Sequence, residues 1–297
     1  MRARGCREYA IGRKKFGKGI RLALDSERNK RWPFAHSVSA LAQMTYTVAH
    51  MTPVLVMMDQ KFSPEDLTKH DSLDLRAIGP KAWETIVASC TATELRLYYL
   101  KIQSLAGAER LRNTLQLNIE YANKVEDISP LFKMRWLTRL FVSDFPRIRR
   151  IDGIEALEDL RQLRLSGNRG SMNPPLRLET VRPIASLRKL EDLEITNIRL
   201  EEKDISFIAD SFPNLRSLRL SWKEFERAQF AYLAKRLNAQ LDEPVVGSRE
   251  MQSALCKCGS KLHLFCGRRM GMLCPVCNAK KFQKLTEEFE NSVGGVA

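Results

Sequence analysis

Two closely spaced cysteine pairs near the C-terminus are the most chemically specific residues of this chain. Cys256 and Cys258 form the first pair, and Cys274 and Cys277 follow after fifteen intervening residues. Four thiolates at this spacing can hold one Zn²⁺ tetrahedrally, each at about 2.3 Å from the metal. Because four protein ligands close the coordination sphere, the spacing predicts a structural zinc ion and leaves no open position for catalysis.

Two further potential ligands lie between these pairs. Cys266 and His263 could each replace a cysteine of the first pair, and a buried thiol and a strand imidazole are the alternative interpretations. Of the seven cysteines, Cys6 and Cys90 are isolated and do not suggest a disulfide framework. This usage predicts a metal site in a protein of a reducing compartment, which we take to be the cytoplasm.

The residues between the cysteine pairs are those of a small β-rich module. Gly259-Ser-Lys-Leu-His-Leu264 is a short apolar strand after a turn glycine, and Gly267-Arg-Arg-Met-Gly271 precedes the second pair. With these motifs the segment resembles the C-terminal zinc ribbons of bacterial type I topoisomerases. It has Cys-x-Cys where that family has Cys-x-x-Cys, and it covers only 22 residues (256–277). The resemblance therefore implies a zinc ribbon and no topoisomerase activity.

The chain that must carry this module shows a repeated apolar pattern. An apolar residue, a variable residue and another apolar residue recur six times, at Leu95/Leu97, Leu115/Leu117, Leu140/Val142, Leu163/Leu165, Leu193/Ile195 and Leu218/Leu220. Successive pairs are 20, 25, 23, 30 and 25 residues apart. A period in the low to mid twenties is typical of leucine-rich repeats.

Residues 154–168 match the pattern L-x-x-L-x-x-L-x-L-x-x-N nearly position by position, with Asn168 in the last place. The chain thus resembles leucine-rich repeat proteins of the short-repeat type, in which that asparagine is buried and hydrogen-bonds the backbone of the turn. The following repeats have Ile198 and Lys223 in its place. The resemblance implies an α/β solenoid of about six irregular repeats with helical caps.

Five segments follow from these patterns. We expect a basic arm at 1–32, an N-terminal cap at 33–85, the solenoid at 86–245, the zinc ribbon at 250–285 and a tail at 286–297. The cap should contain a short buried strand at 53–58 and a helix at 80–90, and a helix at 225–241 should cap the solenoid's C-terminal end.

The net charge of +14 lies mostly at the two ends of the chain. Residues 1–31 hold eleven basic and three acidic residues, and residues 251–297 hold seven and three. Basic ends suit polyanions, and the alternative is a solvated tail. The candidate nucleic-acid contacts around the ribbon are Lys257, Lys261, Arg268, Arg269, Lys280 and Lys281.

The variable residues of the repeats should line the concave face of the solenoid, because side chains alternate across a strand. The predicted central column is Arg96, Gln116, Phe141, Arg164, Glu194 and Arg219. From this column and its neighbours, the candidate partner-binding residues are Arg96, Tyr98, Arg139, Phe141, Arg164, Glu194 and Arg219. A face of mixed sign with arginine and aromatic side chains suits a protein partner.

No catalytic constellation is evident. The four histidines are far apart, no phosphate-binding glycine loop is present, and the most apolar window, 38–58, is interrupted by polar residues and Pro53. We therefore predict a non-enzymatic, protein-binding adaptor without a membrane span or small-molecule substrate, in which the zinc ribbon is a second docking element. The alternative is a nucleic-acid-associated subunit of a larger complex, binding DNA or RNA through the basic arm and the ribbon.

Overall fold

The computed structural model of the chain describes residues 52–167 and 175–295. The expected basic arm, residues 33–51 of the expected N-terminal cap and the asparagine at position 168 lie outside the described residues.

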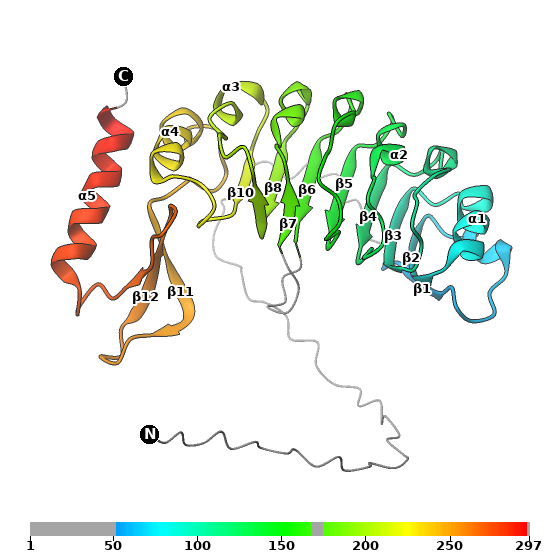
Figure 1. The fold of residues 1–297 in the computed structure, drawn as a ribbon, viewed down its shortest axis with the longest axis horizontal. Coiled ribbons are helices and arrows are strands. Elements are labelled where there is room, and N and C mark those ends of the chain that lie inside the picture. Colours follow the sequence, from blue (N-terminus) through cyan, green and yellow to red (C-terminus); the bar gives the residue numbers. More distant parts are fainter. Residues whose placement is uncertain (1–51, 168–174, 296–297) are drawn as a thin grey trace, which may run out of the picture. The chain divides into compact units, whose positions relative to one another are not determined.

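Eight parallel strands form one continuous sheet (Figure 1). In sheet order they are β1 (Val54–Met57), β2 (Ser72–Ile78), β3 (Glu94–Leu100), β4 (Gln116–Glu120), β5 (Arg139–Ser143), β6 (Gln162–Ser166), β8 (Asp192–Thr196) and β10 (Ser217–Leu220). Short helices return the chain on the other side of the sheet: α1 (Pro80–Ser89), α2 (Ser129–Phe132), α3 (Ile208–Ser211) and the 3₁₀ helices Pro64–Leu67, Ala108–Arg110, Ile154–Ala156 and Arg182–Ser186. Repeated strand–turn units of this kind are a leucine-rich repeat solenoid, so the predicted fold is confirmed.

The apolar pairs of the strands face the return helices and form the core. Leu97, Leu140, Val142, Leu165 and Ile195 have no exposed surface. A single repeat cannot cover these side chains alone, because its two flanks are apolar and only the adjacent repeats bury them. The core is accordingly one continuous cluster along the solenoid.

The structure corrects the predicted apolar pair of the second repeat. Leu95 pairs with Leu117 and Leu97 with Ile119 across β3 and β4, so the buried pair is Leu117/Ile119. Leu115 precedes the strand and is 43% exposed. Both choices place apolar residues on the same side of a strand, and only the cross-strand register distinguishes them.

The sheet also extends into the residues expected to form the N-terminal cap. β1 and β2 belong to it, and Leu73/Leu75 of β2 is a further apolar pair that aligns with Leu95/Leu97. β1 is a strand as expected, but it is not buried. Val54 aligns with Leu73 on the core side and is still 38% exposed because β1 is the edge of the sheet, and Leu55, 54% exposed, aligns with Asp74 on the opposite face. The predicted helix at 80–90 is α1.

A row of left-handed backbone conformations marks the exit of the strands. Five residues at aligned positions have φ between 47° and 62°: Ala77, Tyr99, Tyr121, Asp144 and Asn197. Backbone N–H groups at this row donate to carbonyls of the next repeat; Tyr121 N bonds Ser143 O at 3.0 Å and Asp144 N bonds Ser166 O at 3.0 Å. The following residue, where the family has its asparagine, is a buried apolar one, as at Leu100, Ala122, Phe145 and Ile198. Backbone groups thus supply hydrogen bonds at these turns.

The long repeat step between β6 and β8 contributes one strand to a second, two-stranded parallel sheet, whose other strand follows β8. This second sheet consists of β7 (Leu176–Leu178) and β9 (Ile198–Leu200). The repeat is therefore longer without interrupting the eight-stranded sheet.

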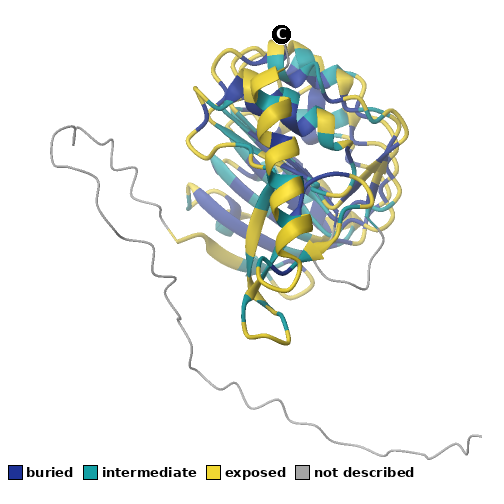
Figure 2. Ribbon diagram, turned by 90° about the vertical axis from the view of Figure 1, so that its left-hand side faces the viewer, coloured by how far each residue is buried: buried dark blue, intermediate teal, exposed yellow. Residues whose placement is uncertain are grey.

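The C-terminal end of the solenoid is covered by two helices and a small sheet. The predicted cap helix is α4 (Arg227–Leu237), and the antiparallel ribbon contains β11 (Ser248–Leu255), β12 (Lys261–Phe265) and β13 (Met272–Leu273). The last helix, α5 (Ala279–Gly295), packs against α4 and presents a largely exposed outer face (Figure 2). The expected tail is thus mostly helix, because Phe289 and Val293 lie one helical turn apart and reach the core.

The corrected register of β4 predicts unequal effects of two leucine substitutions. Leu117→Ala removes a fully buried side chain and should lower the free energy of unfolding by about 2–5 kcal/mol. Leu115→Ala removes an exposed one and should change it by less than about 0.5 kcal/mol. Urea denaturation followed by circular dichroism measures both, and equal losses would show that the register is wrong.

Candidate functional site

One end of the concave face carries a network of paired charges. The Asp74 carboxylate on β2 is almost fully buried and accepts from Arg76 at 2.7 Å and from Arg96 at 3.1 Å. Arg96 also donates to Glu120 at 3.0 Å, and Glu120 accepts from Asn118 at 2.8 Å. A buried carboxylate is tolerated only when it is paired and hydrogen-bonded in this way.

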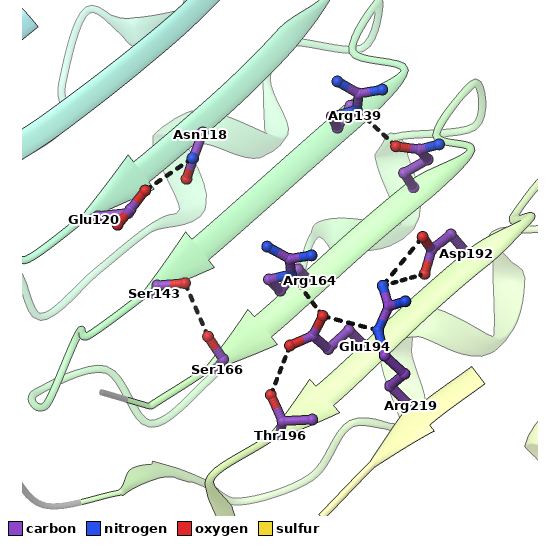
Figure 3. A network of polar contacts seen from close by, with 11 residues as sticks. Asn118, Glu120, Arg139, Ser143, Arg164, Ser166, Asp192, Glu194, Thr196 and Arg219 are labelled. Carbon is purple, nitrogen blue, oxygen red and sulfur yellow. Dashed lines mark hydrogen bonds and ion pairs between the residues drawn. The ribbon is translucent and has the colours of Figure 1, made fainter. Parts of the chain in front are cut away.

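A second network joins β6, β8 and β10 (Figure 3). Glu194 is 3% exposed and lies between two guanidinium groups, with Arg164 at 2.8 Å and Arg219 at 3.0 Å. Thr196 donates to the same carboxylate at 2.9 Å, and Arg219 also reaches Asp192 at 3.1 Å. The side chains of this part of the face are therefore held in fixed positions before any partner binds.

Phe141 on β5 lies at the centre of the face between two arginines. The Arg164 guanidinium is 4.3 Å from its ring centroid and that of Arg139 is 5.7 Å away. Arg139 donates to the side-chain carbonyls of Gln162, at 2.6 Å, and of Gln116. The centre thus combines an aromatic surface with oriented cations.

Three tyrosines gather near the exit ends of β3 and β4. Tyr98 and Tyr121 stack with ring centroids 6.1 Å apart, and Tyr99 lies 5.5 Å from Tyr121. Tyr98 also contacts the guanidinium groups of Arg76 and Arg96. Tyr98 and Tyr121 line a hollow of about 410 Å³. Tyr99 and Tyr121 both have a left-handed backbone, which is energetically unfavourable for a bulky residue. The backbone conformation of the turn therefore does not explain why tyrosines occupy these two positions.

All seven candidate partner-binding residues lie on this one face. The central column differs at one position from the predicted one: Asn118 replaces Gln116, as the corrected register requires. Gln116 lies one column away, beside Arg139.

Sequence reasoning missed a larger hollow, of about 810 Å³, at the C-terminal end of the same face. Its lining includes Arg219 from β10, Trp222, Phe230 from α4 and Arg249 from β11. Arg249 lies 4.6 Å from the Trp222 ring centroid. No periodic pattern joins these residues, so only the docking of the ribbon brings them together.

The four predicted zinc ligands form one cluster. All four sulfur atoms lie within 4.8 Å of one another; Cys256 and Cys277 are 3.8 Å apart, and Cys258 and Cys274 are 3.4 Å apart. Tetrahedral Zn–S bonds of about 2.3 Å place the sulfur atoms about 3.8 Å apart. The cluster therefore fits a tetrahedral metal ion.

Two tight turns position these sulfur atoms. In the first, Cys256 N donates to Ser260 O at 2.8 Å, and Gly259 adopts a φ of +87° that favours glycine. In the second, Cys277 N donates to the Cys274 sulfur at 3.4 Å. Backbone donors to a ligating sulfur stabilise its thiolate form.

The thiols of the cluster differ in acidity. Hydrogen bonds with Ser260 and then Cys274 lower the pKa of Cys258 to about 6. Contacts with Cys258 and Cys256 raise the pKa of Cys277 to about 12. Sulfur atoms this close share protons. A divalent cation that binds to them would displace these protons.

The two surplus candidates, Cys266 and His263, are not part of the cluster. Cys266 is fully buried, and its burial raises the pKa of its thiol to about 11. His263 packs edge-on against Phe282, with ring centroids 5.0 Å apart. Cys266 is therefore a buried thiol and His263 an imidazole on strand β12, as the alternative interpretation of each residue had it.

Arg227 at the start of α4 fixes the ribbon to the solenoid. Its guanidinium donates to the backbone carbonyls of Leu285 and Cys266 and lies 5.6 Å from the Phe265 ring and 5.3 Å from the Phe289 ring. Backbone hydrogen bonds support this contact, since Gly267 N donates to Trp222 O at 2.8 Å and Arg268 N donates to Phe225 O at 2.9 Å.

The six candidate nucleic-acid contacts are not equally available. Lys261 pairs with Glu250 at 2.6 Å and Arg268 with Glu226 at 3.0 Å. Over the described part of the chain, no ion pair involves the other four, namely Lys257, Arg269, Lys280 and Lys281.

These features define a leucine-rich repeat solenoid that ends in a four-cysteine ribbon. No family model and no curated protein matches the chain. Similar solved structures include two internalins from Listeria monocytogenes and a leucine-rich repeat protein from Leptospira interrogans.

Internalin inlF is 20% identical with a TM-score of 0.41, over 56% of this chain and 43% of its own. Internalin C2 is 19% identical with a TM-score of 0.40, over 59% and 63%. The Leptospira protein is 18% identical with a TM-score of 0.35, over 56% and 48%. The matched part spans less than two thirds of each of these proteins.

Within the described residues, none of the helices is both long and apolar enough to cross a membrane.

The contacts of Arg227 predict that its loss destabilises the C-terminal end. Arg227→Ala removes two partly buried hydrogen bonds and the contacts with the Phe265 and Phe289 rings, and should lower the free energy of unfolding by about 1–3 kcal/mol. Arg236→Ala on the same helix removes only an exposed ion pair with Asp210 and should cost less than about 1 kcal/mol. Urea denaturation compares the two, and an equal effect would argue against a fixed ribbon.

Proposed function

We propose that this protein is a non-enzymatic adaptor whose concave repeat face binds a protein partner. The observation that carries the proposal is the fixed arrangement of arginine and aromatic side chains around Phe141 and Tyr98. Such residues dominate protein interfaces, and side chains that are already ordered lose less entropy when a partner binds.

The signs of the charges favour a protein over a polyanion on this face. Asp74, Glu120, Asp192 and Glu194 alternate with the arginines along the sheet. Phosphate groups that follow the face would meet these carboxylates, whereas a folded protein can present charges of both signs. As the second candidate, a nucleic-acid contact belongs to Lys257, Arg269, Lys280 and Lys281, the ribbon cations for which the described residues provide no ion pair.

For the ribbon we propose a structural Zn²⁺ held by the four clustered cysteines, with the module serving as a second docking element. Thiolate donor sets of this kind suit zinc, and the fully protein-derived coordination gives the ion a structural role. Because four of the described cysteines gather at one candidate metal site, we also propose a reducing compartment such as the cytoplasm.

Metal analysis tests the zinc assignment. The purified protein should contain about one equivalent of zinc, and Cys274→Ser should retain less than about half an equivalent because one of four ligands is lost. Cys266→Ala changes a buried thiol outside the cluster and should retain the full amount. Inductively coupled plasma mass spectrometry gives the stoichiometry. Equal zinc content in the two variants would contradict the proposed ligands.

Affinity purification tests the concave face. Proteins cross-linked to the wild-type protein in cells should be lost, by about tenfold or more, with the double variant Tyr98→Ala/Phe141→Ala, since aromatic anchors at interfaces are each worth about 1–2 kcal/mol or more. The control Tyr232→Ala changes an aromatic residue of α4, whose hydroxyl contacts Asp210 away from this face. Quantitative mass spectrometry, with and without nuclease, reads the outcome. Partners that survive the double variant but disappear with nuclease would favour the nucleic-acid alternative.

A further inference from the structure

Five arginines lie on the strands of the eight-stranded sheet, and one of them differs from the rest. Arg76, Arg96, Arg164 and Arg219 each form an ion pair with a carboxylate on the same face. Across residues 52–167 and 175–295, no ion pair involves Arg139. Within these residues its positive charge therefore has no carboxylate partner, at the start of β5 and next to the central column.

Two neutral amides hold Arg139 in place. Gln116 on β4 and Gln162 on β6 accept from it on either side, the latter at 2.6 Å. An amide carbonyl orients a guanidinium without neutralising it, and Arg has five N–H donors, so further donors remain. The result is a cation whose position is set before binding and whose charge is still available.

The surroundings of Arg139 define what can approach it. The ring of Phe141 lies 5.7 Å away and supplies an apolar surface. A hollow of about 420 Å³ is lined by Arg139, Phe141 and Gln116 and, on the β3 side, by Arg96 and Glu94. The Glu94 carboxylate accepts from the Ser72 hydroxyl at 3.3 Å, and a ligand group that enters on the β5 side meets the Arg139 guanidinium beside the Phe141 ring.

We infer that Arg139 binds a carboxylate of the partner, an aspartate or glutamate side chain whose neighbouring apolar side chain rests on Phe141. This rests on the proposed function of the concave face. One unpaired positive charge matches one negative charge, and a guanidinium fork matches the planar carboxylate. A phosphate dianion would need a second available cation, but the guanidinium groups of Arg96 and Arg164 are already paired.

Selection of peptides from a random display library on the full-length protein tests the inference. Peptides enriched on the wild-type protein should contain an acidic residue next to an apolar one. For a synthetic peptide from that set, Arg139→Gln should weaken binding by about 10- to 100-fold, since a charge-assisted hydrogen bond contributes about 1.5–3 kcal/mol. The control Arg177→Gln makes the same change on β7, outside the eight-stranded sheet, and should leave binding within about twofold.

A double-mutant cycle makes the test specific to the carboxylate. Changing the acidic residue of the peptide to its amide should weaken binding to the wild-type protein but not to Arg139→Gln. An unchanged circular dichroism spectrum and a cooperative urea transition would show that Arg139→Gln is folded, although loss of the hydrogen bonds with Gln116 and Gln162 can lower its stability. If the amide peptide loses the same affinity on both proteins, or if the selected peptides need Phe141 but carry no acidic residue, the carboxylate assignment is wrong and the proposed function stands. If no peptide is enriched, or none depends on Tyr98 or Phe141, both fail.

Discussion

The register of the parallel strands is the constraint on which the rest of this structure depends. Each repeat contributes one strand and one short return segment, and neither can bury its apolar residues without the next repeat. Aligned pairs such as Leu97 and Ile119 build the core, and the same alignment brings Arg96 beside Asn118 on the opposite side of the sheet. Core and concave surface are therefore set by one geometric relation, since a slip of one residue would exchange the two faces.

Electrostatic pairing on the concave face follows from this register. Glu194 meets Arg164 and Arg219 because those residues occupy aligned positions on adjacent strands, 30 and 25 residues away in the chain. The same alignment places glutamines on both sides of Arg139. Within the described residues, carboxylates therefore pair with four of the five strand arginines, whereas the two side chains that accept from Arg139 are neutral amides.

Sequence patterns predicted the elements whose signal is local. The apolar pairs predicted six of the strands, the helical spacing of apolar residues predicted α4, and the spacing of the cysteines predicted their cluster. What could not be predicted depends on distant partners: Leu115 and Leu117 are both apolar, and only the neighbouring strands decide between them. Leu73/Leu75 is a further pair, but its position before the expected array led us to expect a cap. The docking of the ribbon through Arg227 joins residues 39 and 58 positions apart and has no sequence pattern.

The row of left-handed residues at the strand exits has a consequence for how this chain can vary. Where a buried asparagine ends the repeat pattern, no other amino acid can replace it, because its side-chain amide supplies the hydrogen bonds of the turn. Here backbone groups of successive repeats supply such bonds, and the position of that asparagine in the pattern holds residues as different as Ala122 and Phe145. That position is then limited by the volume available to it and not by hydrogen bonding. The repeats can therefore diverge in sequence at the site that defines the family while their shape persists.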